Sequence, residues 1–224
     1  MIEVYLEVGA KRTFASAVEW PGWSCGGRDA EEALRALVEA GPRYAQIVQC
    51  ADPSLHGLAS PAELLVVEQL EGDSGTEFGV PSVVPSCDTR PLDEAGLKRL
   101  QALLRACWDA FDAAVASAVG VELRKGPRGG GRELDAIVAH VREAERSYLA
   151  QLGGKPERRP AATPEQQHEQ LRQVALDTMA AAMRGEIAAR GPRGGVRWPP
   201  RYFARRAAWH LLDHIREIAE RRMD

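Results

Sequence analysis

The chain has 224 residues, of which 45% are hydrophobic and 27% charged, and its formal net charge is −3. These values suit one large folded domain or two modest ones, and the small net charge gives no electrostatic reason to expect nucleic-acid binding. No apolar run approaches the ~20 residues of a membrane helix, and the N-terminus lacks the basic-then-apolar pattern of a signal peptide. Four widely spaced cysteines without a CxxC pair favour reduced thiols. We therefore expect a cytoplasmic protein that associates with neither membranes nor nucleic acid.

Strand patterns open the chain. Residues 2–8 alternate apolar and polar side chains, and residues 13–20 follow after a short turn, so a hairpin is predicted. Asp29 is a good N-cap for the helix that comes next. In that helix Gly41 and Pro42 interrupt the helical pattern, because proline removes a backbone hydrogen bond.

The chain changes to helical patterns near residue 90. Residues 64–70 are predicted to form a further strand, and residues 71–91, rich in Gly, Ser and Pro, a loop or linker. Beyond them, apolar side chains recur at helical spacing in four segments, at about residues 92–119, 132–152, 164–190 and 199–222. Four amphipathic helices of this length bury their apolar faces most economically in a four-helix bundle.

Two similar loops join these helices in pairs. GPRGGGR occupies residues 126–132 and GPRGGVR occupies residues 191–197. Each is most simply a turn, although the backbone amides of a Gly-rich loop with arginines also suit an anion. The middle connection, residues 153–163, is long enough to span a whole helix, so the sequence leaves the handedness of the bundle open.

Three histidines share an unusual position on two of the predicted helices. His210 and His214 lie four residues apart, one helical turn, at the border of an apolar stripe, and His140 lies at the matching border of another helix. Three imidazoles with an open position are typical of a catalytic divalent metal site, with zinc or nickel favoured and iron or manganese next. The alternative is a set of solvated polar residues. His56 and His168 lie in polar segments and are predicted at the surface.

Acidic residues near these histidines are the candidates for proton transfer. HLLDH lacks the glutamate of the HExxH motif, so peptidase chemistry has no support. Glu145 falls on an apolar helix face, where a carboxylate needs a partner. It either orients a histidine ligand or acts as a base, or it makes a structural bond to an arginine of a neighbouring helix. Asp213 and Glu217 are the other two candidates for these roles.

The C-terminal part, residues 92–224, resembles the DinB-like superfamily of four-helix bundles, which includes YfiT-type hydrolases and mycothiol-dependent maleylpyruvate isomerases. IVAHVREAERSYLAQLG (residues 137–153) and AAWHLLDHIREIAER (residues 207–221) carry the resemblance. It implies an up-down-down-up bundle, often dimeric, with a divalent metal on His140, His210 and His214. It also implies thiol-dependent transferase, isomerase or hydrolase activity with bacillithiol, mycothiol or glutathione.

The N-terminal part, residues 1–75, resembles a HicB-like β-β-α-β unit, with residues 76–91 as linker. FASAVEWPGWSCGGRDAEEALRALVEA (residues 14–40) carries this resemblance. No added DNA-binding segment is recognisable, so we interpret the unit as an accessory or oligomerisation module. Trp20 and Trp23 either roof the metal pocket or belong to the core.

Together these patterns predict an α+β protein and leave two functions open. The first is a divalent-metal-dependent homodimeric enzyme, an S-transferase, isomerase or hydrolase that acts on a small molecule with a low-molecular-weight thiol as cosubstrate. The second is a non-enzymatic binding protein, in which the HicB-like unit recognises a partner and the metal site is structural or empty. Histidines that reach solvent favour the first function, and histidines closed over by aromatic side chains favour the second.

Overall fold

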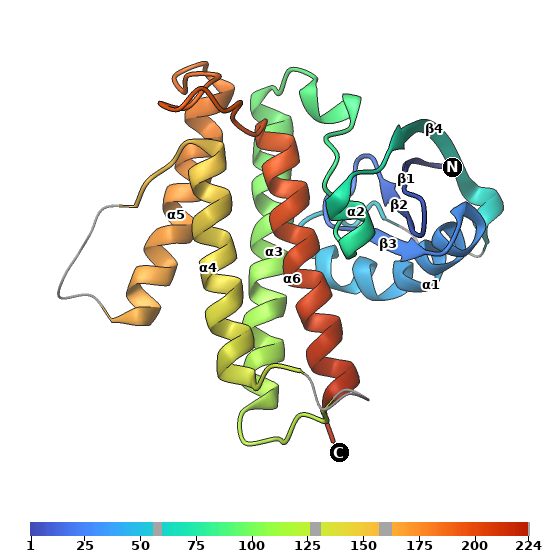
Figure 1. Ribbon diagram of the computed structural model, residues 1–224. Helices are drawn as coiled ribbons and strands as arrows, with labels where there is room; N and C mark the ends of the chain where they lie inside the picture. The colour runs from blue at the N-terminus through green and yellow to red at the C-terminus, as the bar shows by residue number, and fades with distance from the viewer. Residues whose placement is uncertain (56–59, 126–130, 157–162, 224) are drawn as a thin grey trace.

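A computed structural model describes residues 1–55, 60–125, 131–156 and 163–223. The chain is α+β: a four-stranded sheet near the N-terminus packs beside four long helices (Figure 1). Within these residues no helix is long and apolar enough to cross a membrane. His56 and the first five residues of the 126–132 loop lie outside the described residues.

The sheet is mixed, in the order β3-β2-β1-β4. Strands β1 (Ile2–Val8), β2 (Thr13–Ala17) and β3 (Ser24–Gly27) form an antiparallel meander, and β4 (Leu64–Glu71) pairs in parallel with β1. A parallel pair needs a crossover, and helix α1 (Ala30–Val48) supplies it. Three strands therefore precede α1, one more than the β-β-α-β pattern contains.

Helix α1 begins where the sequence predicts, with the Asp29 side chain accepting a hydrogen bond from the Glu32 amide. The predicted interruption at Gly41 and Pro42 is wrong, because α1 continues through both. Burial outweighs the helix-breaking preference here. A Cβ atom at Gly41 would lie 3.0 Å from the Trp23 ring, so the glycine allows close packing of α1 on the sheet layer.

Residues 71–91 are more ordered than the predicted loop. They contain helix α2 (Ser74–Phe78) and the 3-10 turn η2 (Ser86–Thr89). The buried carboxylate of Glu7 accepts hydrogen bonds from the backbone amides of Ser82 and Val83, each at 3.1 Å. Glycine, serine and proline signal turns, but they do not reveal such anchoring by a distant strand.

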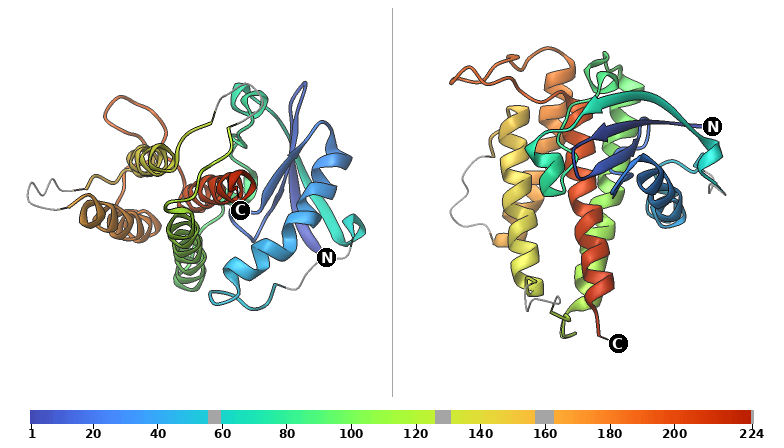
Figure 2. Two further views of the ribbon diagram at one scale, coloured as in Figure 1. Left: turned by 90° about the horizontal axis from the view of Figure 1, so that it is seen from below. Right: turned by 45° about the vertical axis from the view of Figure 1, so that its right-hand side comes forward.

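The four long helices pack side by side, as Figure 2 shows end-on. They are α3 (Glu94–Ala118), α4 (Leu134–Leu152), α5 (Pro164–Met183) and α6 (Pro200–Arg221). Helices α3 and α6 run in one direction, and α4 and α5 run in the other (Figure 1). The predicted helices are confirmed, except that α5 ends at Met183 rather than near Arg190, and Gly185 follows at a φ of 76°.

The loop at residues 191–197 is a turn that satisfies its own backbone. The Gly191 amide donates to the Gly195 carbonyl at 2.8 Å, and the Gly194 amide donates to the Gly191 carbonyl at 2.9 Å. These amides are therefore engaged within the loop, which fits the simpler of the two interpretations of this segment.

Helix α6 joins the helices to the sheet layer. The buried Arg205 guanidinium pairs with Asp88, with its Nε 2.7 Å from Oδ2, and donates to the carbonyls of Ala17 and Val18 at 2.6 and 2.8 Å. Trp20 and Trp23 lie in the core of the sheet layer, as the second of their two interpretations predicts. The same α6 backbone thus contacts the sheet and carries two of the three histidines.

Candidate metal centre

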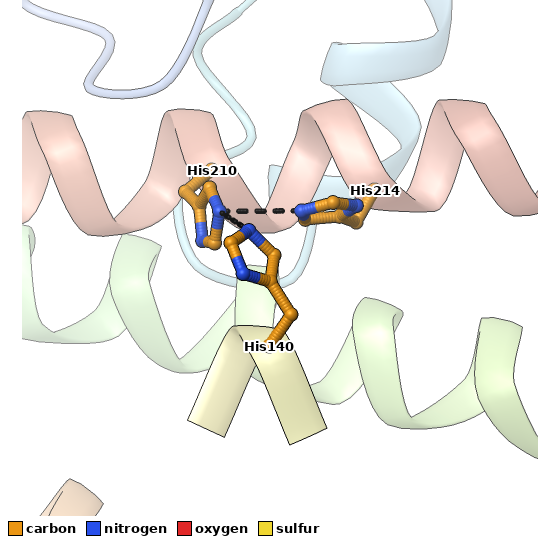
Figure 3. Close-up of side chains that lie close together, drawn as sticks. All are labelled: His140, His210 and His214. Atoms are coloured by element: carbon orange, nitrogen blue, oxygen red, sulfur yellow. Dashed lines mark hydrogen bonds between the residues drawn. The ribbon is translucent and has the colours of Figure 1, made fainter. Parts of the chain in front are cut away.

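His140, His210 and His214 meet between α4 and α6 (Figure 3). The Nε2 atom of His210 lies 3.2 Å from that of His140 and 3.2 Å from that of His214. Ligand atoms of all three side chains lie within 4.8 Å of one another. The predicted convergence of the three imidazoles is therefore confirmed, and the group is positioned to hold a metal ion.

The apolar stripes of the two helices set this position. Ile137 and Val141 of α4 and Leu211 and Ile215 of α6 are buried in the shared helical core. Each histidine is next to such a residue in sequence, so it comes to the edge of the same contact. His210 and His214 are buried, whereas His140 is half-buried, so His140 of α4 is the member of the group that reaches solvent.

The spacing of the nitrogens fits a first-row metal ion. Two imidazoles bound to tetrahedral zinc, with Zn–N bonds of about 2.05 Å, place their nitrogens about 3.3 Å apart. The two separations that involve His210 Nε2 are both 3.2 Å. The Nε2 atom of His210 faces two other Nε2 atoms, and one proton can bridge only one of these contacts. A cation bound by all three lone pairs satisfies the whole group.

The surroundings of His210 and His140 favour the neutral form of each imidazole. Burial, followed by the neighbouring imidazoles of His214 and His140, lowers the pKa of His210 to about 2. Burial also lowers the pKa of His140, and the positive charge of Arg132 adds to this effect. Neutral imidazoles are the form that binds metals, so these two side chains need to release no proton to accept one.

Glu217 orients His214. Its Oε2 atom lies 2.8 Å from His214 Nδ1, and its Oε1 atom lies 2.5 Å from Arg221 Nη1. Burial opposes ionisation of Glu217, but these two bonds outweigh it and lower the pKa of the carboxyl. A carboxylate that accepts the Nδ1 proton fixes the tautomer in which the Nε2 lone pair points to the metal position. Of the three acidic residues predicted near the site, Glu217 is the one whose side chain bonds one of these histidines.

Arg221 extends this arrangement, and the sequence analysis did not single it out. Besides Glu217, it donates to the backbone carbonyls of Arg124 and Arg132 at 3.0 and 2.8 Å. The connection between α3 and α4 is thereby tied to the end of α6. The available signal was the four-residue spacing between Glu217 and Arg221, which pairs opposite charges along a helix.

Asp213 does not join the three histidines. Its carboxylate pairs with Arg216 at 2.6 Å, and its side chain faces the groove between α6 and the sheet layer, which Trp23 also lines. The two residues adjacent in sequence, Asp213 and His214, therefore face different parts of the molecule, as a rotation of ~100° per residue requires.

Glu145 is buried, but its partners lie away from the metal centre. It accepts hydrogen bonds from Trp108 Nε1 and His168 Nε2, both at 2.5 Å. Glu145 therefore makes structural hydrogen bonds, as one of its two interpretations predicts, but its partners are a tryptophan and a histidine rather than an arginine. The prediction that His168 lies at the surface is wrong, because its side chain is only 9% exposed. His168 lies three residues before the buried Leu171, on the same face of α5.

Comparison of the chain with protein-family models, curated proteins and solved structures finds no match. The side chains of the site provide three convergent imidazoles, one oriented by a carboxylate and one half-buried, at the junction of two helices.

Proposed function

We propose that the protein is a divalent-metal-dependent enzyme that acts on a small molecule. The observation that carries this proposal is the convergence of three imidazoles, in which His210 Nε2 lies 3.2 Å from each of the other two Nε2 atoms and His140 is half-buried. A structural zinc site is closed by four protein ligands, whereas three ligands leave a position for water or substrate. Three imidazoles without a thiolate favour zinc or nickel, with iron or manganese next.

His140, His210 and His214 would hold the divalent ion, and the chemistry that it would supply is a nucleophile at neutral pH, because metal binding lowers the pKa of water or of a thiol. The protein's own residues position the ligands. Glu217 holds the tautomer of His214, and Arg221 holds Glu217. The Tyr148 ring lies edge-on to His210, with 5.7 Å between centroids, and burial raises the pKa of its hydroxyl. Tyr148 therefore stays protonated and is a hydrogen-bond donor near the site.

The proposed reaction class is a thiol-dependent S-transfer, an isomerisation or a hydrolysis. The resemblance of residues 92–224 to the DinB-like superfamily supports it, together with the direction of the four helices (Figure 1). The cosubstrate would be a low-molecular-weight thiol of the bacillithiol, mycothiol or glutathione type. We also propose a cytoplasmic homodimer, with the HicB-like residues 1–75 as an accessory module.

Metal content of the purified full-length protein is the direct test. We expect close to one zinc or nickel per chain after purification without chelator, and loss of that metal in His210→Ala and His214→Ala. Asp213→Asn is the matched control, because this residue is adjacent to His214 and faces away from the group. Wild-type protein that contains no metal and takes up neither ion would refute the proposal and favour a non-enzymatic binding protein.

A further inference from the structure

Two adjacent arginines of α6 are buried to the same degree but have opposite surroundings. Arg205 is 6% exposed and is paired with the Asp88 carboxylate and two backbone carbonyls. Arg206 is 7% exposed, and within the described part of the chain its Nη2 reaches only the Tyr148 hydroxyl, at 3.4 Å. Its Nη1 is buried and has no hydrogen-bond partner there. Burying a guanidinium without an anion costs free energy, and this cost is offset for Arg205 by Asp88 but is not offset for Arg206 within the described residues.

Arg206 lies beside the metal centre. It precedes His210 by four residues and so occupies the same side of α6, one turn away. Its guanidinium carbon lies 5.5 Å from the centroid of the Tyr148 ring and 5.0 Å from that of the Trp209 ring. These ring contacts stabilise the cation, but they provide no acceptor for its N–H groups. The aromatic walls therefore hold the charge in place without neutralising it.

The charges around the three histidines do not balance once a metal binds. Arg132 and Arg206 both contribute, after burial and the neighbouring imidazoles, to the lowered pKa of His210. The carboxylate bonded to the group is that of Glu217, and it is shared with Arg221. In the described residues, the Arg132 and Arg206 charges thus lie near a group whose bonded carboxylate, Glu217, is already paired with Arg221. A site with this excess of positive charge attracts an anion.

We infer that the small molecule recognised by the three-histidine site carries a carboxylate, which would pair with Arg206 while another part of the molecule would face the metal. The inference rests on the proposed function, since it places the substrate relative to a bound metal. Arg206 acts as a binding residue that selects the charge of the ligand. The Tyr148 hydroxyl, adjacent to Nη2, is the second donor available to the carboxylate. Both aromatic rings shield this pair from water, which strengthens it.

The test compares two thiol probes that differ in charge at one end, 3-mercaptopropionate and its neutral amide, 3-mercaptopropanamide. Full-length protein is loaded with cobalt(II), and probe binding is followed through the change in the cobalt absorption spectrum. A charge-assisted hydrogen bond between a carboxylate and Arg206 in a shielded site should raise the affinity for a ligand about 10- to 100-fold. We therefore expect the wild type to bind the carboxylate probe at least about 10-fold more tightly than the amide. This comparison needs no variant.

Variants then locate the preference. Arg206→Gln removes the charge and should abolish the preference, while cobalt affinity stays within about threefold of the wild type or rises. Arg206→Lys should retain part of it. Arg216→Gln is the matched control, an arginine of the same helix that is 60% exposed and paired with Asp213. Cobalt binding with no charge preference in the wild type, or a preference that survives Arg206→Gln, would overturn the inference and leave the metal site intact. Failure to bind cobalt at all would instead overturn the proposed function.

Discussion

Removal of the Glu217 carboxylate should weaken metal binding through His214, although Glu217 is not itself a proposed ligand. The bond between Glu217 Oε2 and His214 Nδ1 is 2.8 Å long and joins an ionised acceptor to a ring donor. Such bonds are worth about 1.5–3 kcal/mol, and each 1.4 kcal/mol is tenfold in affinity. The Glu217 side chain is 27% exposed, so solvent screening places the effect in the lower part of that range.

We therefore expect Glu217→Ala to lower zinc affinity about 10- to 50-fold. Glu217→Gln should have a smaller effect, because the amide oxygen still accepts the Nδ1 proton but carries no charge. The assay is competition with a chelator of known zinc affinity. Glu220→Gln is the control, since this glutamate lies on the same helix and its side chain is 68% exposed. A zinc affinity of Glu217→Ala within twofold of the wild type would refute the role of Glu217 in orienting the ligand.

Three further outcomes are expected. The folded-state pKa of His210 is about 2, below its unfolded value near 6.5. Metal-free protein should therefore lose stability as the pH falls from 6.5, by up to about 3 kcal/mol at pH 4.5. His210→Gln should flatten this pH dependence of the free energy of unfolding, measured by denaturant titration. Asp88→Ala should lower the free energy of unfolding by about 3–5 kcal/mol by leaving Arg205 buried without its anion; a loss below 1 kcal/mol would contradict this. Glu145→Ala should destabilise the protein by about 1–3 kcal/mol in the same assay but leave zinc affinity unchanged.

The sequence predicts the helices and the three histidines well because both depend on periodicity. Apolar residues at helical spacing define each long helix, and the position of His140 on its stripe matches that of His210 and His214 on theirs. When these two stripes pack against each other, residues at their matching borders come to one edge of the contact. Periodicity does not specify which helices pair, so the choice between convergent and solvated histidines depends on the structure.

Features that depend on partners distant in the chain cannot be predicted from sequence periodicity. Helix α1 continues through Pro42 because burial against the sheet layer outweighs a local preference. His168 lies in a polar run, and its burial depends on Glu145, twenty-three positions earlier in the chain. The missing partner of Arg206 is likewise a property of the assembled structure, since a sequence shows which charges exist but not which remain unpaired.

The adjacency of Arg205 and Arg206 has a mechanical consequence. Neighbouring residues on a helix point about 100° apart, so α6 offers one side to the sheet and another to the histidines. If α6 rotated or slid so that Arg205 lost its bonds to the Ala17 and Val18 carbonyls, His210 would also move, because it lies five positions further along the same helix. The sheet layer therefore sets the register of the metal ligands. Zinc loading should accordingly slow amide hydrogen exchange in β2, a strand that contains none of the three histidines.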